Sequence, residues 1–180
     1  VICICEKEVI VVDSVADKLK KEMVKHGAYE LKGQEIEAIT KLVIDDAGRL
    51  VHEGAANKAY VGKNADFIAK GIGLSLPPTV RLLICDVPQD HPLVWTEQLM
   101  PVMPVVRVKD VDTAIDFAVQ VEHGFRHTAI MHSMNIAKLS KMAKVMNCSI
   151  FIKNAPSYAG LGAGGAGFTS FTIASPTGEG

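Results

Sequence analysis

Hydrophobic positions along the chain follow two different periods. Short runs of apolar and β-branched residues, bounded by polar residues, Gly or Pro, are typical of buried strands. They predict strands at Glu8–Val12, Val80–Val87, Pro104–Asp110, His127–Ser133 and Cys148–Asn154. Elsewhere apolar residues recur every three or four positions, which is typical of amphipathic helices. This period predicts helices from Ser14 to about His26, Gln34 to Asp46, Asn64 to Lys70, Asp110 to about His123, and Asn135 to Met146.

Each predicted helix is defined by a capping residue, a stop residue or an apolar face. SVAD, which begins at Ser14, resembles a capping box, and Gly27 is the expected stop of that helix. Asp110 and Asn135 are the expected N-caps of the last two helices. The residues expected to face inward are Val15, Leu19 and Met23, then Ile36, Ile39 and Val43, then Ala114, Phe117 (or Ala118) and Val121, and last Ile136, Leu139, Ala143 and Met146.

The order of these elements predicts the fold class. Strands that alternate with helices indicate an α/β domain with a mostly parallel sheet and helices packed against its faces. The segment HPLVWTEQLMP at 91–101 interrupts the pattern and is expected to be irregular. From Ala155 onward the chain is rich in glycine and is expected to be a loop.

Composition narrows the class of protein without naming an activity. The chain has 180 residues, of which 48% are hydrophobic and 22% charged, as expected of one soluble globular domain. Its formal net charge of -1 argues against a nucleic-acid partner, which would call for a basic face. No apolar run approaches the ~20 residues that cross a membrane. Four cysteines without a CxxC pair argue against a disulfide scaffold and a zinc site, so we expect reduced thiols and no metal.

Cys3 and Cys5 are the first candidates for chemistry. A cysteine is usually a small buried hydrophobe. Catalytic thiols, however, often lie where a loop enters a strand, and both residues precede the first predicted strand. A thiolate nucleophile also needs an acid–base partner or an oxyanion stabiliser nearby.

Six histidines could supply that partner. His91 precedes a proline in a loop and can be structural or functional. His127 and His132 bracket one short predicted strand and, being five apart, point to opposite faces, so that one can be buried and the other exposed. Glu97 lies in TEQLMPVMP, a mixed apolar and proline-rich loop, where a carboxylate is either a satisfied loop group or a contact for ligand hydroxyls.

The segment GLGAGGAG contains two matches to GxGxxG, one starting at Gly160 and the other at Gly162. A dinucleotide-binding fingerprint must follow a strand and open a helix. The residues after this segment are rich in Thr and β-branched side chains and have no helical period. We therefore reject a nucleotide-binding fold here and expect a loop that lines a substrate site, where glycine lets the backbone approach a ligand closely.

Taken in order, several segments resemble the CoA-acylating branch of the aldehyde dehydrogenase superfamily. CIxEKEVxVVDSVAD from Cys3 is similar to the segment with the nucleophile in propionaldehyde and acetaldehyde dehydrogenases of propanediol and ethanolamine utilisation. EQLMPVMPVV from Glu97 is similar to the family's Glu-x-x-x-Pro-x-x-Pro segment, HTAIMHS from His127 to GHTxxxxS, and NAPSYAGLGAGGAG from Asn154 to the C-terminal signature. The resemblance covers nearly the whole chain. One departure is Ile2, where relatives often have Pro.

The resemblance implies a role for each matching residue. Cys3 is the implied thiol nucleophile, with Cys5 second, because relatives often have Ala there. Glu97 is the implied contact of the nicotinamide ribose, and His127 is the histidine near the thioester. Asn154 and the loop with Gly160 and Gly162 are implied to face the substrate.

The same resemblance implies an NAD-dependent enzyme that uses coenzyme A as co-substrate and converts a short-chain aldehyde to acyl-CoA. The implied fold is the three-layer α/β/α catalytic domain of the aldehyde dehydrogenase fold. We expect residues 1–180 to be a fragment of that domain, cut from a longer chain that also has a nucleotide-binding domain. The implied protein is a homo-oligomer in the cytoplasm or in a bacterial microcompartment, with no membrane or nucleic-acid partner.

Other functions remain open at the level of the sequence. The first alternative is a non-acylating or phosphate-dependent member of the same superfamily, which a requirement for CoA would distinguish. An assembly domain without activity is another. A cysteine hydrolase would need a His oriented by Asn or Asp against the thiol, and the sequence has no local signature for one.

Overall fold

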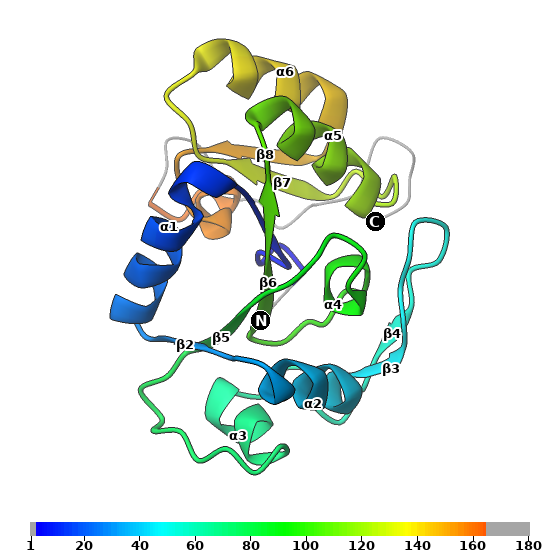
Figure 1. Cartoon of the computed structure of the whole chain (residues 1–180). Coiled ribbons are helices and arrows are strands. Elements are labelled where there is room, and N and C mark those ends of the chain that lie inside the picture. Colours follow the sequence, from blue (N-terminus) through cyan, green and yellow to red (C-terminus); the bar gives the residue numbers. More distant parts are fainter. Residues whose placement is uncertain (1–2, 165–180) are drawn as a thin grey trace. The chain divides into compact units, whose positions relative to one another are not determined.

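The computed structural model describes residues 3–164. The chain divides into two compact units, with the boundary between Asp110 and Val111. Figure 1 follows both units along the chain, and each is described by itself. The prediction that residues 1–180 form a fragment of one catalytic domain stays a prediction.

The first unit is built on a four-stranded sheet. Its strands β1 (Val9–Val12), β6 (Val102–Val108), β5 (Leu82–Asp86) and β2 (Ala28–Glu30) lie in the order β1-β6-β5-β2. Every pair is parallel. The predicted α/β class with a mostly parallel sheet is therefore confirmed. β2 was not predicted, because a strand of three residues gives too short a pattern.

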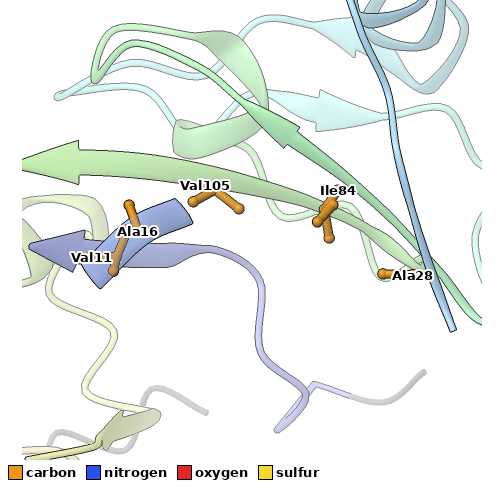
Figure 2. Close-up of a cluster of buried hydrophobic side chains, with 5 residues drawn as sticks. All are labelled: Val11, Ala16, Ala28, Ile84 and Val105. Atoms are coloured by element: carbon orange, nitrogen blue, oxygen red, sulfur yellow. The ribbon is translucent and has the colours of Figure 1, made fainter. Parts of the chain in front are cut away.

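Side chains of this sheet alternate between two buried faces. On one face Val11, Val105, Ile84 and Ala28 form a row that follows the strand order and packs against Ala16 of α1 (Asp13–Lys25) (Figure 2). On the other face Leu83, Cys85 and Val106 are fully buried. A parallel sheet buried on both faces explains why its strands appear in the sequence as continuous apolar runs rather than as alternating ones.

The predicted inner face of α1 is wrong. Val15 and Leu19 are exposed, whereas Ala16 is fully buried and Met23 packs partly against the sheet. The inner face instead includes Lys20, whose ammonium is held by carboxylates at the carboxyl end of the sheet. The predicted capping box is also absent: α1 begins at Asp13, and its N-cap Val12 makes no side-chain capping bond.

The link from β2 to β5 contains α2 (Gln34–Val43), β3 (Ile44–Asp46), β4 (Ala55–Ala56) and α3 (Ala65–Lys70). α2 was predicted to reach Asp46, but its last three expected residues form β3, which pairs antiparallel with β4. Ile39 and Val43 are buried as predicted, and Ile36 is half-buried. α3 follows its N-cap Asn64, one residue after the predicted start.

The structure also differs from the prediction at β6 and in the segment before it. The segment 91–101 was expected to be irregular, yet Pro92–Trp95 form the short helix α4. β6 starts at Val102, before its predicted start at Pro104. Proline lacks a backbone N–H and is usually found at the ends of strands, so the predicted strand was started at Pro104.

The second unit contains α5 (Val111–Val121), β7 (Thr128–Met131), α6 (Ile136–Met146), β8 (Ile150–Lys153) and the 3-10 helix η1 (Ser157–Leu161). β7 and β8 pair in parallel. Its core contains Ile115, Ala129, Met142 and Met146. The regular turn η1 lies where a loop was predicted.

Helix faces in the second unit were predicted in part. Asn135 caps α6 as expected, since its side chain accepts a hydrogen bond from Lys138 N at 3.1 Å. Leu139 and Met146 are buried as predicted, but Ile136 is 76% exposed. Ile136 is the first residue of α6 and lies outside the core. Met142, which was not predicted to face inward, belongs to the core instead.

Candidate active site

The two N-terminal cysteines lie in a turn that leads to β1. Cys3 is exposed and Cys5 is half-buried. Ile4 between them is buried, at 3% exposure, and anchors the turn against the protein. Anchored in this way, the turn presents the Cys3 thiol to solvent.

The other two thiols are poor candidates for a nucleophile. Burial raises the pKa of Cys85 to about 12, and it also raises the pKa of Cys148. Both side chains therefore remain protonated thiols near neutral pH, and the thiolate is the reactive form. Burial thus argues against Cys85 and Cys148, and exposure favours the N-terminal turn.

Glu97 projects from a densely packed segment. Leu93 to Thr96, Gln98 and Met100 are all buried, while Glu97 is exposed. Gln98 Nε2 donates to the Leu93 carbonyl, and Thr96 Oγ1 accepts from Gly48 N at 2.8 Å. These contacts hold the backbone on both sides of Glu97, so that its carboxylate faces outward from a fixed support.

The backbone next to Glu97 is strained. Leu99 has φ +53°, a left-handed conformation that is uncommon for a residue with a branched side chain. Its carbonyl accepts a hydrogen bond from Gly62 N at 3.0 Å. Such strain persists only where the surrounding structure imposes it, and it is frequent at functional sites.

The turn with Cys3 and the segment with Glu97 are tied together. Lys7 Nζ donates a hydrogen bond to the carbonyl of Val94 in α4 at 2.6 Å. Lys7 follows Cys3 by four positions, and Val94 precedes Glu97 by three. Within the first unit, the structure therefore brings these two predicted site segments side by side.

His91 has a structural role in this segment. It is the N-cap of α4, and its Nδ1 accepts a hydrogen bond from Leu93 N at 3.3 Å. Burial lowers the pKa of His91, which favours the neutral ring that can accept this bond.

His127 lies in the second unit, just ahead of β7. It is half-buried, and its Nδ1 is 2.6 Å from Thr128 Oγ1. Its backbone N–H donates to Glu122 Oε1 at 3.1 Å. His132, at the other end of β7, is exposed, as the spacing of the two histidines allowed.

Asn154 lies at the opposite end of the β7–β8 pair from His127. Its side chain is exposed but bonded: Oδ1 accepts from Ser133 N at 2.8 Å, and Nδ2 donates to Ser133 O at 3.0 Å. Asn154 also has φ +53°, which Asn tolerates better than most residues. The structure thus shows a clasp between the segments that follow β7 and β8, and the predicted substrate contact of Asn154 stays a prediction.

The structure gives conformational reasons for both predicted loop glycines. A β-carbon on Gly160 would overlap the side chain of Ile150 and press on Ile152, so glycine lets η1 lie close against β8. Gly162 ends η1 with φ +87°. Their substrate role stays a prediction. Ile2 and positions 165–180 of the predicted signature lie outside the described residues.

Sequence reasoning missed a network of charges at the carboxyl end of the sheet. Arg107 bonds Asp86 through Nε at 2.8 Å, Asp13 through Nη1 at 3.0 Å and Asp17 through Nη2 at 2.5 Å. Lys20 Nζ bonds Asp86 at 2.9 Å. Burial alone would raise the pKa of Asp86, but hydrogen bonds from Arg107 and Lys20 hold it below its ordinary value. The signal in the sequence was Arg107, a single charged residue in an otherwise apolar strand, which indicates nearby carboxylate partners.

The chain matches the model of the aldehyde dehydrogenase family over residues 1–171. The chain belongs to the aldehyde dehydrogenase family. Among family relatives, it is 48% identical over 179 residues to the propanal dehydrogenase (CoA-propanoylating) of Citrobacter freundii, covering 99% of this chain and 37% of that protein. It is also 48% identical over 185 residues to the acetaldehyde dehydrogenase (acetylating) of Bilophila wadsworthia, covering 100% of this chain and 38% of that protein.

A solved structure of the family has the same fold. A propionaldehyde dehydrogenase from the fucose utilisation bacterial microcompartment of Clostridium phytofermentans matches with a TM-score of 0.89 and 42% identity. The match covers 99% of this chain and 40% of that one. The chain therefore spans less than half of the length of these family members.

Among residues 3–164, no three His, Cys, Asp or Glu side chains are grouped so that they could hold a metal ion. In the same part of the chain, no helix has both the length and the apolar character needed to cross a membrane.

Proposed function

We propose that this chain is the thiol-bearing catalytic part of a CoA-acylating aldehyde dehydrogenase. The enzyme converts propionaldehyde or acetaldehyde, with NAD and CoA, to the acyl-CoA and NADH. The observation that carries the proposal is the exposed Cys3 thiol in an anchored turn, tied to the packed segment that presents Glu97. Two relatives at 48% identity have acylating activities in their names, which supports this substrate class.

Cys3 has the role of nucleophile. Its thiolate attacks the aldehyde carbonyl carbon and forms a thiohemiacetal, whose carbon then loses a hydride to leave a thioacyl group on Cys3. NAD, when bound, accepts that hydride. The thiol of CoA then attacks the thioacyl carbon, and the Cys3 thiolate leaves as acyl-CoA forms.

Glu97 is suited to hold the nucleotide. An exposed carboxylate on a fixed backbone can accept hydrogen bonds from the two hydroxyls of a ribose. Because the support of Glu97 is packed on both sides, holding the ribose would cost little conformational entropy in this segment. A nucleotide-binding domain elsewhere in the complete protein would supply the remaining contacts.

His127 has the role of a proton acceptor for the CoA thiol. In the tautomer whose Nδ1 donates to Thr128 Oγ1, Nε2 is the acceptor nitrogen that would take the proton. Replacing His127 with Asn should slow acyl transfer to CoA while the affinity for NAD stays the same. Equal losses in both would count against this role.

Asn154, Gly160 and Gly162 would border the substrate, as the family resemblance implies.

The complete protein is proposed to be a homo-oligomer in the cytoplasm or in a bacterial microcompartment. The second location rests on the solved relative from a fucose utilisation microcompartment. Its partners would be the aldehyde and CoA, with no nucleic acid and no membrane.

The deciding experiment follows NADH absorbance with the complete protein, propionaldehyde and NAD, with and without CoA. We expect sustained turnover only with CoA, loss of turnover in Cys3→Ala, and retained turnover in Cys5→Ala. Turnover without CoA would assign a non-acylating or phosphate-dependent dehydrogenase. A protein that binds none of these substrates would favour an assembly domain.

A further inference from the structure

Lys7 is a largely buried ammonium between the two candidate site segments. Its side chain is 22% exposed, and Nζ lies 2.6 Å from the Val94 carbonyl and 3.1 Å from Glu8 Oε2. An ammonium is strongly hydrated, so removing it from water is costly unless charged or dipolar partners replace the water. Its contact with a main-chain carbonyl 87 positions away is therefore a specific part of this fold.

The two segments that Lys7 joins lead into adjacent strands. The turn with Cys3 leads into β1, and the segment with α4 and Glu97 leads into β6, which pairs with β1 in parallel. Strand pairing fixes the segments only from Val9 and Val105 onward. Before that point, the hydrogen bond from Lys7 to Val94 is a polar link between them.

A second feature makes Val94 a firm anchor. Leu93 and Val94 are fully buried, and Gln98 Nε2 donates to the carbonyl of Leu93, next to the carbonyl that Lys7 uses. Two neighbouring carbonyls of α4 thus accept hydrogen bonds, one from Gln98, which follows Glu97, and one from Lys7, which follows Cys3 by four positions. If Lys7 shifted, the Cys3 turn would move relative to α4, which is held in place by its buried side chains.

We propose that Lys7 is a positioning residue for this site. It sets the place of the Cys3 thiol relative to the Glu97 carboxylate, so that the carbon bonded to the thiol meets the nucleotide held by Glu97 at the right distance for hydride transfer. The proposal rests on the proposed function. Hydride transfer is sensitive to such placement, because a displacement of about 1 Å at a reacting centre can cost ~100-fold in rate.

The test compares Lys7→Met and Lys7→Arg with Lys20→Met in the complete protein. Lys20 is a matched control: its side chain is 12% exposed, and its ammonium is held by Glu30 and Asp86 at the other end of the same sheet. Methionine keeps most of the length of either side chain and removes its charge. Arginine at position 7 keeps a donor for the Val94 carbonyl.

Three quantities are measured for each variant. They are the single-turnover rate of NADH formation, the dissociation constant for NAD, and the rate at which iodoacetamide alkylates Cys3, resolved from Cys5 by mass spectrometry of the labelled peptide. The midpoint of thermal unfolding is recorded beside them. Together they separate a placement effect from a general loss of stability.

We expect Lys7→Met to lower the single-turnover rate ~10- to 100-fold, to change the alkylation rate of Cys3, and to leave the NAD dissociation constant close to that of the unchanged protein. Lys7→Arg should restore most of the rate. Lys20→Met should lower the unfolding midpoint without these changes. An unchanged rate in Lys7→Met, or equal losses in the two methionine variants, would overturn the proposal.

The same experiments distinguish failure of the proposed function from failure of the proposal on Lys7. If the proposed function is wrong, the unchanged protein itself forms no NADH from the aldehyde. The alkylation rates still decide the role of Lys7, because they need neither cofactor nor aldehyde. A Cys3 thiol that reacts at the same rate with and without the Lys7 ammonium would show that Lys7 does not position it.

Discussion

Arg107 and Asp86 lie on the neighbouring strands β6 and β5, and Nε of Arg107 donates to Oδ2 of Asp86 at 2.8 Å. The same carboxylate oxygen accepts from Lys20 at 2.9 Å. Asp86 is thus the shared acceptor of two cations at the carboxyl end of the sheet. The segment with Cys3 enters this sheet at its amino end, so the network lies away from the proposed nucleophile.

Replacing Asp86 with Ala should destabilise the first unit without affecting chemistry. The change removes the shared acceptor and leaves two partly buried cations with fewer partners, at a cost of about 1–3 kcal/mol. Denaturant unfolding measures this cost. Asp45→Ala, at an exposed position of β3, is the control and should change stability by less than about 0.5 kcal/mol. Equal effects of both changes would contradict a special role for Asp86.

Gly48→Ala should disturb the support of Glu97. A β-carbon at Gly48 would lie 2.5 Å from the carbonyl oxygen of Trp95 and 2.7 Å from Oγ1 of Thr96, immediately before Glu97. We expect a loss of about 1–3 kcal/mol from overpacking and a weaker affinity for NAD, measured by fluorescence titration.

The matched glycine change is Gly33→Ala. Gly33 has open space around it but φ +51° and ψ -121°, so alanine there costs about 1–3 kcal/mol of backbone strain. A similar loss of stability with unchanged NAD affinity would show that the effect of Gly48→Ala on binding comes from Glu97. If both variants bind NAD equally well, the packed support does not control Glu97.

Two changes at Asn154 should separate hydrogen bonding from strain. Asn154→Gly removes the two bonds to Ser133 and relaxes the positive φ, whereas Asn154→Ala removes the bonds and keeps the strain. Alanine should therefore be less stable than glycine by about 1 kcal/mol. Hydrogen exchange at the Ser133 amide is the direct measurement. Protection of that amide should fall in both variants, and unchanged protection would mean that the clasp does not form in solution.

Asp112 should contribute stability that depends on pH. Hydrogen bonds from Lys138 and Lys141 lower the pKa of Asp112 from its ordinary 3.8 to about 2. A group with a lowered pKa in the folded state stabilises the protein above its unfolded pKa, and the contribution is lost as pH falls through the folded value. Asp112→Asn should therefore be less stable than the unchanged protein at pH 7, and the difference should shrink between pH ~4 and ~2.

Denaturant unfolding at a series of pH values tests this dependence. Asp116→Asn, one turn further along the same helix, is the control, because Asp116 is an exposed carboxylate. A difference between Asp112→Asn and the unchanged protein that is constant from pH 7 to pH 3 would refute the expected linkage.

Local periodicity was enough to place most of the elements. The strands β1, β5, β7 and β8 and all five predicted helices lie within a few residues of their predicted bounds. The short strands β2, β3 and β4 were missed, because two or three residues cannot establish a period. Tertiary contacts also override local patterns, as in α1, where a salt-bridged Lys20 faces inward and Leu19 faces out.

The candidate site was predicted largely through family resemblance. From the residues alone, Cys3 was one of several thiols, and only tertiary burial separates it from Cys85. Lys7 could not be recognised, because its partner is a main-chain carbonyl far along the chain. The clasp of Asn154 depends in the same way on the parallel pairing of β7 and β8.

The order of pairing in the first sheet also has a consequence for how the protein is made. Val9 pairs with Val105, so β1 leaves the ribosome nearly a hundred residues before its partner strand exists. At about 5–20 residues per second, the wait is roughly 5–20 seconds. During that time the Cys3 thiol belongs to an unpaired apolar segment. Its strand pairing can form only after β6 emerges, so the segment with Cys3 stays without its native partner strand for that part of synthesis.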